Sequence, residues 1–189
     1  MQRIGIFGGA FDPIHVGHLI LAQDVWDNVE LDKIIFLVNF KPPHKEVFAP
    51  FEDRYNMVKR ALEGNGNFEA SDFERRIEIE PSYTVNVLSE LSKVNPDWDF
   101  YLIIGWDQYS SLSSWYRPDL LLSMVKLIVL KRPGWQVASK LTAEAIFVDE
   151  RLVDISSTEV RDKVRKGKSI KYLVPPAVEN YIFEKGLYK

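Results

Sequence analysis

The chain has 189 residues, of which 46% are hydrophobic and 27% are charged, and its formal net charge is −3. It contains no cysteine, which excludes disulfides, thiolate nucleophiles and cysteine-ligated metal centres. No apolar run approaches the roughly 20 residues that span a bilayer, and the acidic balance argues against a general nucleic-acid binder, so we expect neither a membrane nor a nucleic-acid partner.

The first half of the chain alternates apolar runs with helical spacing. Ile4–Phe7 is a short apolar run, and Lys33–Val38 is a longer one rich in branched residues, which is typical of a parallel strand covered on both faces. Between them we expect a helix over about His15–Val29. Three prolines predict a loop over Phe40–Pro50, and the spacing of the residues that follow predicts a helix ending near Gly64.

The second half of the chain continues this alternation. Its expected elements are short strands at Phe68–Ser71 and Ile77–Ile79, a helix opened by Ser82–Thr84, buried strands at Phe100–Ile104, Val125–Leu130 and Ala145–Val148, a helix begun by Ser156, and a closing helix over Pro175–Phe183. The proline pair at the start of the last helix suits a helix N-terminus.

Strands that alternate with helices predict an α/β fold. We expect a doubly wound, mostly parallel sheet of Rossmann-like type, with a small helical segment at the C-terminal end. In such a sheet, ligands bind at the carboxyl ends of the strands, near the point where the strand order reverses. No repeat or linker divides the chain, so we expect one domain over residues 1–189. The first apolar run is too short for a signal peptide, and we therefore expect a cytoplasmic location.

The turn after the first expected strand has the features of a phosphate site. Gly8 and Gly9 let backbone approach a ligand closely, and the following helix presents unpaired N–H groups and a partial positive charge. His15 and His18 lie on one face of that helix. They could belong to a metal site, be incidental polar residues, or donate hydrogen bonds to a phosphate. The third interpretation fits the glycines best, and His44 is the only other histidine.

A second polar element lies near the C-terminal end. Ser156, with Glu159 three residues later, forms a capping-box pattern at the start of a helix. Arg161 follows one turn beyond that N-terminus, where its planar guanidinium can bind phosphate oxygens. The other basic residues up to Lys171 are interpreted as a solvated face with some effect on electrostatic steering.

The motifs of three common enzyme classes are absent. The chain lacks Gly-x-Gly-x-x-Gly after the first strand and Gly-x-x-x-x-Gly-Lys-Ser/Thr anywhere, which disfavours dinucleotide-binding dehydrogenases and P-loop NTPases. It also lacks the Gly-x-Ser-x-Gly elbow of α/β-hydrolases.

Two segments resemble the signatures of one enzyme superfamily. Gly9–His18 resembles the Gly-x-Phe-Asp-Pro-x-His-x-Gly-His signature of nucleotidyltransferases with a dinucleotide-binding-like fold. Ile155–Arg161 resembles their second signature, Ile-Ser-Ser-Thr-x-Ile/Val-Arg. The two segments stand in the order of the superfamily and at opposite ends of the expected domain, so the resemblance implies a Rossmann-like nucleotidyltransferase fold.

Further segments narrow the resemblance to the bacterial nicotinate-mononucleotide adenylyltransferases, over nearly the whole chain. They are Pro42–Lys45, Ser82–Thr84, Gly105 and Asp107 followed by Leu112, Trp115–Tyr116, and Leu130–Gly134. Phosphopantetheine adenylyltransferases are shorter and lack the Pro-Pro-His-Lys loop, and cytidylyltransferases lack the Trp-Tyr pair. The chain departs from the family pattern at Ala10, where Ser or Thr is common, and at Trp106, where a small residue is usual.

The resemblance implies that the chain transfers the adenylyl group of ATP to nicotinate mononucleotide, and that His15, His18 and Arg161 are catalytic. The residues implied to bind ATP are Gly8, Gly9, Ala10, Phe11, His15, His18, Gly105, Asp107, Ile155, Ser156, Ser157, Thr158 and Arg161. Those implied to bind the mononucleotide are Lys45, Thr84, Trp115 and Tyr116. We expect Mg²⁺ as a cofactor bound mainly through ATP, without protein ligands.

Two alternatives stay open at the level of sequence. One is a related nucleotidyltransferase with another phosphate acceptor, such as nicotinamide mononucleotide or phosphopantetheine. The other is a non-catalytic nucleotide-binding regulator, which the loss of His15, His18 or Arg161 would have supported, although all three are present. The sequence does not fix the oligomeric state, and a homo-oligomer is compatible with it.

Overall fold

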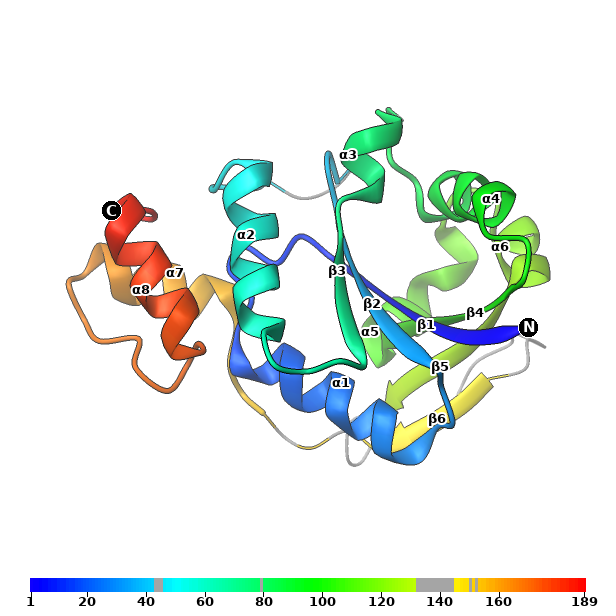
Figure 1. Cartoon of the computed structure of the whole chain (residues 1–189), viewed down its shortest axis with the longest axis horizontal. Helices are drawn as coiled ribbons and strands as arrows, with labels where there is room; N and C mark the ends of the chain where they lie inside the picture. The colour runs from blue at the N-terminus through cyan, green and yellow to red at the C-terminus, as the bar shows by residue number, and fades with distance from the viewer. Residues whose placement is uncertain (43–45, 79, 132–144, 150, 152) are drawn as a thin grey trace.

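A computed structural model describes residues 1–189 except 43–45, 79, 132–144, 150 and 152. The described residues form a six-stranded sheet in the order β3-β2-β1-β4-β5-β6, in which each neighbouring pair is parallel (Figure 1). The strands are β1 (Gln2–Gly9), β2 (Lys33–Val38), β3 (Phe68–Ser71), β4 (Trp98–Gly105), β5 (Val125–Lys131) and β6 (Ala145–Asp149). The predicted doubly wound, Rossmann-like α/β fold is thereby confirmed.

Helices cover both faces of the sheet. They are α1 (Val16–Asn28), α2 (Phe51–Leu62), α3 (Phe73–Ile77), α4 (Thr84–Val94), α5 (Trp106–Ser111), α6 (Pro118–Met124), α7 (Ser157–Arg165) and α8 (Pro176–Lys185), with a 3₁₀ turn at Leu112–Ser114. The helices α1, α2, α7 and α8 share one apolar core with the sheet, and α3 to α6 share a second core on the opposite face.

The strand β2 is apolar from Ile34 to Val38, after Lys33 at its first position. Alternate side chains of a strand point to opposite faces of the sheet. Ile34 and Phe36 pack in the core shared with α1 and α2, whereas Ile35 and Leu37 pack in the core shared with α4. Because both faces are covered, positions 34–38 of this strand are all apolar, and its one polar residue, Lys33, lies at the partly exposed start.

The strand order reverses between β1 and β4. The chain runs outward from β1 through β2 to β3, and then returns to place β4 on the other side of β1. The carboxyl ends of these two central strands are Gly9 and Gly105, which are both residues of the predicted site. The topology therefore brings these two predicted segments to one edge of the sheet.

One predicted strand is wrong. The sequence predicts a strand at Ile77–Ile79, but Ile77 is the last residue of helix α3. An arginine–aspartate ion pair across one helical turn supports this helix. Glu78 then has a φ of 49°, in the left-handed region, which interrupts an extended run. Ile79 itself lies outside the described residues.

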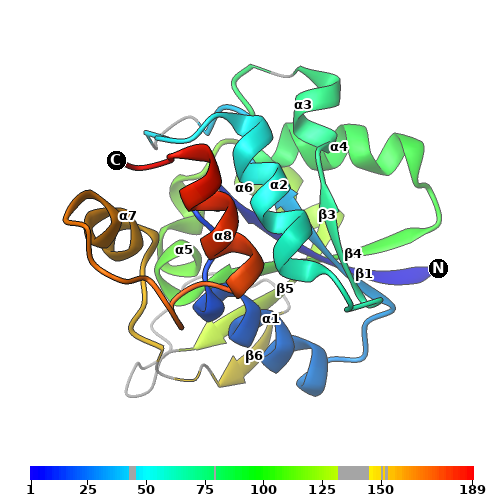
Figure 2. The same ribbon diagram turned by 60° about the vertical axis from the view of Figure 1, so that its left-hand side comes forward.

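The C-terminal helices extend the first core. Both views show α8 running beside α2, with α7 close to the same side of the sheet (Figures 1 and 2). Tyr181 of α8 donates a hydrogen bond to Asp53 of α2 at 2.8 Å, and Val178 and Ile182 are fully buried. The predicted C-terminal helical segment therefore covers the outer side of α2.

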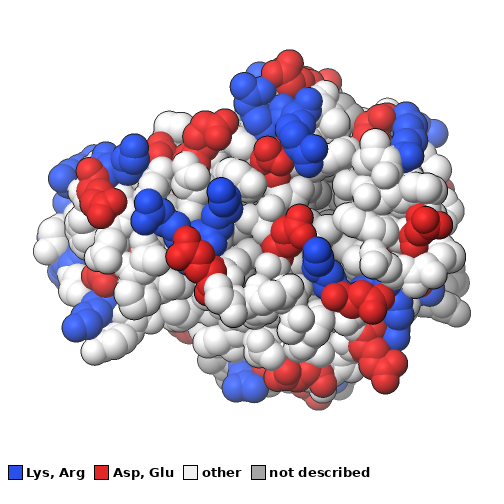
Figure 3. Space-filling model, in the orientation of Figure 1, with Lys and Arg blue, Asp and Glu red and all other residues white. Residues whose placement is uncertain are grey.

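Positive and negative side chains are interspersed on the face drawn in Figure 3. Basic residues form ion pairs with acidic ones, such as Lys33 with Glu69 at 2.7 Å and Arg75 with Glu78 at 2.6 Å. Among the described helices, none has both the length and the apolar character that crossing a membrane requires.

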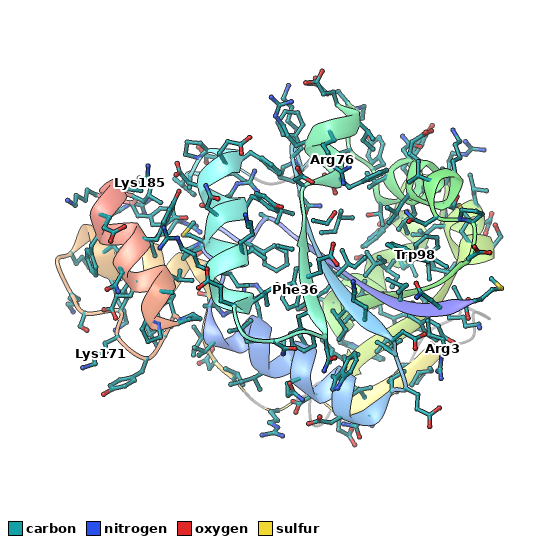
Figure 4. All side chains as sticks on the ribbon, viewed as in Figure 1. Arg3, Phe36, Arg76, Trp98, Lys171 and Lys185 are labelled. Atoms are coloured by element: carbon teal, nitrogen blue, oxygen red, sulfur yellow. The ribbon has the colours of Figure 1, made fainter. Side chains whose placement is uncertain are left out.

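Phe36 tests the contribution of the first core to stability. Its ring is fully buried between the sheet and α2 (Figure 4) and lies 5.3 Å from Phe7 and 5.7 Å from Phe68, measured between ring centroids. Phe36→Ala leaves a cavity there, and we expect the free energy of unfolding to fall by about 3–5 kcal/mol in urea denaturation. The matched control Phe183→Ala, at a half-exposed position of α8, should cost less than about 1 kcal/mol. Equal losses in the two variants would contradict this account of the core.

Candidate active site

The turn after β1 places two histidine rings against each other. His15 is the N-cap residue of α1 and is buried, and His18 lies in the first turn of the helix. Their ring centroids are 3.7 Å apart. A Cβ atom at Gly17 would lie 2.9 Å from Nδ1 of His15, so a larger residue between the two histidines would displace the His15 ring.

The hydrogen bonding of His18 fixes which nitrogen carries its proton. Nδ1 of His18 accepts a hydrogen bond from the backbone N–H of His15 at 3.2 Å. An accepting Nδ1 is unprotonated, so the ring proton lies on Nε2, which is the donor. Phe11 packs edge-on against the ring at 5.2 Å and supports this orientation.

Phe11 and Ala10, which the resemblance implies bind ATP, both have buried side chains. Phe11 is 2% exposed and has a φ of 47°, and its ring lies over Gly9, where a Cβ atom would approach it within 2.9 Å. Ala10 is buried as well, and its carbonyl accepts a hydrogen bond from Arg54 at 2.7 Å. In this arrangement the two residues offer a ligand their backbone rather than their side chains.

Asp12 is buried beneath the same turn and fastens it to distant segments. One carboxylate oxygen accepts a hydrogen bond from the N–H of Phe48 at 2.6 Å. The other accepts from the N–H of Ala49 at 3.1 Å and from the hydroxyl of Tyr188 at 2.7 Å. Burial, together with the charge of Asp12, raises the pKa of Tyr188, which keeps this hydroxyl protonated as a donor.

The second predicted motif lies directly against the first. Ser156 caps α7 by accepting a hydrogen bond from the N–H of Glu159 at 3.1 Å, as predicted. The hydroxyl of Ser157 donates to the carbonyl of Pro13 at 2.9 Å. The N-terminus of α7 is therefore joined to the turn that carries the histidines.

The side chain of Arg161 is buried. It is 7% exposed, and its guanidinium donates to the carbonyl of Asp12 at 2.7 Å and to the hydroxyl of Thr158 at 3.1 Å. The ring of Phe48 covers it, with 4.3 Å from the ring centroid to the guanidinium carbon. Arg161 thus links the two motifs, and its charge lies beneath the surface at their junction.

A cavity of about 810 Å³ lies on the other side of the turn. It is lined by Asn39, Pro42, Ser82, Tyr83, Thr84, Val85, Ser111, Ser114, Trp115, Tyr116 and Arg117. Three of the four residues predicted to bind the mononucleotide, Thr84, Trp115 and Tyr116, therefore come together, although they come from separate parts of the chain. Tyr116 stacks on Tyr83, with ring centroids 4.6 Å apart.

The remaining predicted residues take varied positions. Gly105 is the N-cap of α5, and Asp107 is exposed in the first turn of that helix. Ile155 packs against the first core beside α7. Trp106, the second departure from the family pattern, is buried against Tyr109 in the opposite core. Lys45 lies outside the described residues.

Sequence reasoning misses two buried charged residues beside the site, Arg54 and Glu74. Arg54 lies on the helical stripe that also holds Phe51 and Val58, where a core-facing residue is expected. The sequence signal for Arg54 is that an arginine stands where the helical spacing predicts an apolar residue. Glu74 lies in the helix that the sequence does not predict.

The chain is similar in sequence to known proteins. Residues 6–163 match the family described as Cytidylyltransferase-like. Over its whole length the chain is 42% identical to a protein of Caldicellulosiruptor saccharolyticus named "Probable nicotinate-nucleotide adenylyltransferase", all of which it covers. It is 43% identical to a protein of the same name from Halalkalibacterium halodurans, of which it covers 92%.

Solved structures share the fold. A nicotinic acid mononucleotide adenylyltransferase of Plasmodium falciparum complexed with NaAD superposes with a TM-score of 0.82 at 22% identity, covering 100% of this chain and 98% of that one. A structure of the same Plasmodium enzyme complexed with APC gives 0.80 at 23% identity, with the same coverage. At such low identity the likeness shows the fold alone.

The hydrogen bond from Tyr188 to Asp12 can be tested by its removal. Tyr188→Phe keeps the ring but leaves a buried carboxylate oxygen with one donor fewer, so we expect the free energy of unfolding to fall by about 1–3 kcal/mol. Urea denaturation measures the change. Tyr172→Phe serves as the control, because Tyr172 is 80% exposed. If both variants unfold at the wild-type midpoint, the bond does not hold the turn.

Proposed function

The chain belongs to the nicotinate-nucleotide adenylyltransferases of the cytidylyltransferase-like family, and we propose that it transfers the adenylyl group of ATP to nicotinate mononucleotide. The products are deamido-NAD and pyrophosphate, and the reaction is a step of NAD biosynthesis. The observation that carries this assignment is the identity of 42% over the whole chain. Two features of the structure support it. The two motifs are adjacent, and Thr84 and Trp115 line one cavity.

The reaction needs little proton abstraction. The attacking group is the 5′-phosphate of the mononucleotide, and the second pKa of such a phosphate is about 6. It is therefore mostly dianionic at neutral pH and already nucleophilic. His15 and His18 then serve to orient the transferring phosphoryl group and to stabilise its charge by hydrogen bonding, with the Nε2 proton of His18 as a donor. Alignment for in-line attack and charge stabilisation supply the catalysis, without a covalent intermediate.

The leaving pyrophosphate lies at the N-terminus of α7 in this proposal. The first N–H groups of a helix lack intrahelical partners and favour an anion. The hydroxyl of Thr158 is exposed in the first turn. A guanidinium has five N–H donors, so Arg161 keeps donors for phosphate oxygens besides those it uses on Asp12 and Thr158.

The pyridine ring of the acceptor occupies the cavity. Trp115 offers its face for stacking, with Tyr116 beside it. Thr84 is the first residue of α4, so the N–H groups of that helix N-terminus favour a carboxylate on the ring over a neutral amide. Lys45 is expected to contact the phosphate of the mononucleotide.

Mg²⁺ accompanies ATP in this proposal. Within the part of the chain that the structure describes, no three His, Cys, Asp or Glu side chains are grouped as metal ligands. Both carboxylate oxygens of Asp12 already accept protein hydrogen bonds. An ion held by phosphate oxygens and water fits this donor set, and it supplies charge neutralisation of the triphosphate.

A panel of acceptors tests the function. Purified protein is given Mg-ATP with nicotinate mononucleotide, nicotinamide mononucleotide, phosphopantetheine or no acceptor, and pyrophosphate release is measured. We expect the highest kcat/KM with nicotinate mononucleotide. Release with phosphopantetheine instead would assign another acceptor, and no release with any of them would support a non-catalytic nucleotide binder.

His18→Ala tests the role of the histidines. Loss of one transition-state donor is expected to lower kcat by about 100- to 1,000-fold, with the circular dichroism spectrum and the unfolding midpoint unchanged. Lys168→Ala, at an exposed position after α7, is the control and should retain wild-type turnover. Near-normal kcat in folded His18→Ala would remove His18 from the reaction.

Trp115→Ala tests the position of the pyridine ring. Because stacking is lost, the KM for nicotinate mononucleotide should rise by about tenfold, while the KM for ATP stays within about twofold. Steady-state kinetics with each substrate varied in turn separates the two constants. An unchanged KM for the mononucleotide would exclude Trp115 from the acceptor site.

A further inference from the structure

A buried cation on α2 holds the turns that border both halves of the site. Arg54 is 1% exposed, and burial lowers the pKa of its guanidinium, partly offset by the charge of Asp12. The hydrogen bonds of Arg54 go to backbone carbonyls, at 2.7 Å to Ala10, 2.8 Å to Asn39, 3.3 Å to Phe40 and 3.2 Å to Ala49. One side chain therefore joins the turn after β1 to the segment after β2.

Glu74 of α3 contacts two of the residues that Arg54 holds, Asn39 and Phe40. It accepts hydrogen bonds from them, whereas Arg54 donates. It is 2% exposed, and its two oxygens accept hydrogen bonds from the side-chain amide of Asn39 at 2.8 Å and from the N–H of Phe40 at 2.9 Å. Burial raises the pKa of Glu74, while these hydrogen bonds act against the rise. The dipeptide 39–40 is thus held through its carbonyls by Arg54, and through the N–H of Phe40 and the side-chain amide of Asn39 by Glu74.

This dipeptide touches both halves of the site. The backbone N–H of Asn39 donates to the carbonyl of Gly9 at 2.9 Å, at the end of the strand that leads to the histidines. Asn39 also lines the cavity, as does Ser82, whose hydroxyl donates to the carbonyl of Lys41 at 2.9 Å. A shift of the dipeptide would therefore move the cavity wall relative to the turn after β1.

Stability alone does not account for this pair. Burial strips hydration from both ions, and apolar side chains of similar volume often give a core that is at least as stable. Charged hydrogen bonds add direction, because they fix where the backbone groups must lie. We propose that Arg54 and Glu74 are positioning residues that hold Asn39–Phe40 in place and thereby set the affinity for the pyridine mononucleotide. The proposal rests on the proposed function, which assigns that ligand to the cavity.

Two conservative substitutions separate positioning from folding. Arg54→Lys keeps the charge, but one ammonium group cannot reach all four carbonyls. Glu74→Gln keeps the shape, but its amide has one accepting oxygen for two donors. In each variant we expect the KM for nicotinate mononucleotide to rise by about tenfold or more. In Glu74→Gln the KM for ATP should stay within about twofold, whereas Arg54→Lys also loses a contact with Ala10 and is judged only by the KM for the mononucleotide. The readout is steady-state kinetics of the full chain with Mg-ATP.

The controls are matched in chemistry and lie nearby. Arg76→Lys and Glu78→Gln alter exposed ion pairs at α3, and both KM values should remain at the wild-type level. A purely structural role predicts a lower unfolding midpoint with unchanged KM values in the folded protein. That result, or an equal rise of both KM values in Glu74→Gln, would overturn the proposal.

A second experiment uses the wild-type chain and therefore does not depend on how the variants fold. Amide hydrogen exchange of Phe40 reports on the hydrogen bond to Glu74. Saturating nicotinate mononucleotide should slow this exchange more than ATP does, and an unchanged rate would overturn the proposal. If the wild type releases no pyrophosphate with nicotinate mononucleotide, the proposed function fails. If the wild type releases it normally and Arg54→Lys and Glu74→Gln have the same KM values as the controls, only the positioning roles are refuted.

Discussion

The turn over residues 10–13 is held in place by side chains from three distant parts of the chain. Arg54 of α2 takes the carbonyl of Ala10, and Arg161 of α7 takes that of Asp12. Tyr188, near the C-terminal end, donates to the carboxylate of Asp12. Because His15 lies two residues beyond this turn, the position of the histidines depends on the packing of α2, α7 and the C-terminal segment. Fold and site are therefore parts of one cooperative unit.

The same contacts explain how charge is tolerated beneath the site. Two buried cations, Arg54 and Arg161, lie near two buried carboxylates, Asp12 and Glu74. Their hydrogen bonds go mainly to backbone groups of the turns, so the charges fix the path of the backbone as well as compensating one another. In the proposed function, a triphosphate above this layer meets helix N-termini and histidine donors.

Much of the fold could be predicted from the sequence because its signals are local. The apolar runs of the central strands and the cap at Ser156 mark elements that the structure contains. The region around Ile77 could not be predicted, since three residues of alternation do not distinguish a strand from the end of a short helix. Arg54 was missed because periodicity identifies a buried position and not the long-range acceptors that make a charge acceptable there.

The candidate site was predictable to a similar degree. Thr84, Trp115 and Tyr116 were identified through family resemblance, and the structure brings them to one cavity. The burial of Phe11 and Arg161 was not predictable, because it depends on Gly9 and on Phe48. Such contacts depend on tertiary packing, which a motif does not specify.

In the proposed function, a single nucleotide product spans from the histidines to the cavity across the turn after β1. A crystal structure of the chain with deamido-NAD measures this directly. The account predicts a phosphate oxygen within hydrogen-bond distance of Nε2 of His18 and the pyridine ring against Trp115. A pyridine ring bound outside the cavity, or a phosphate remote from His18, would contradict it.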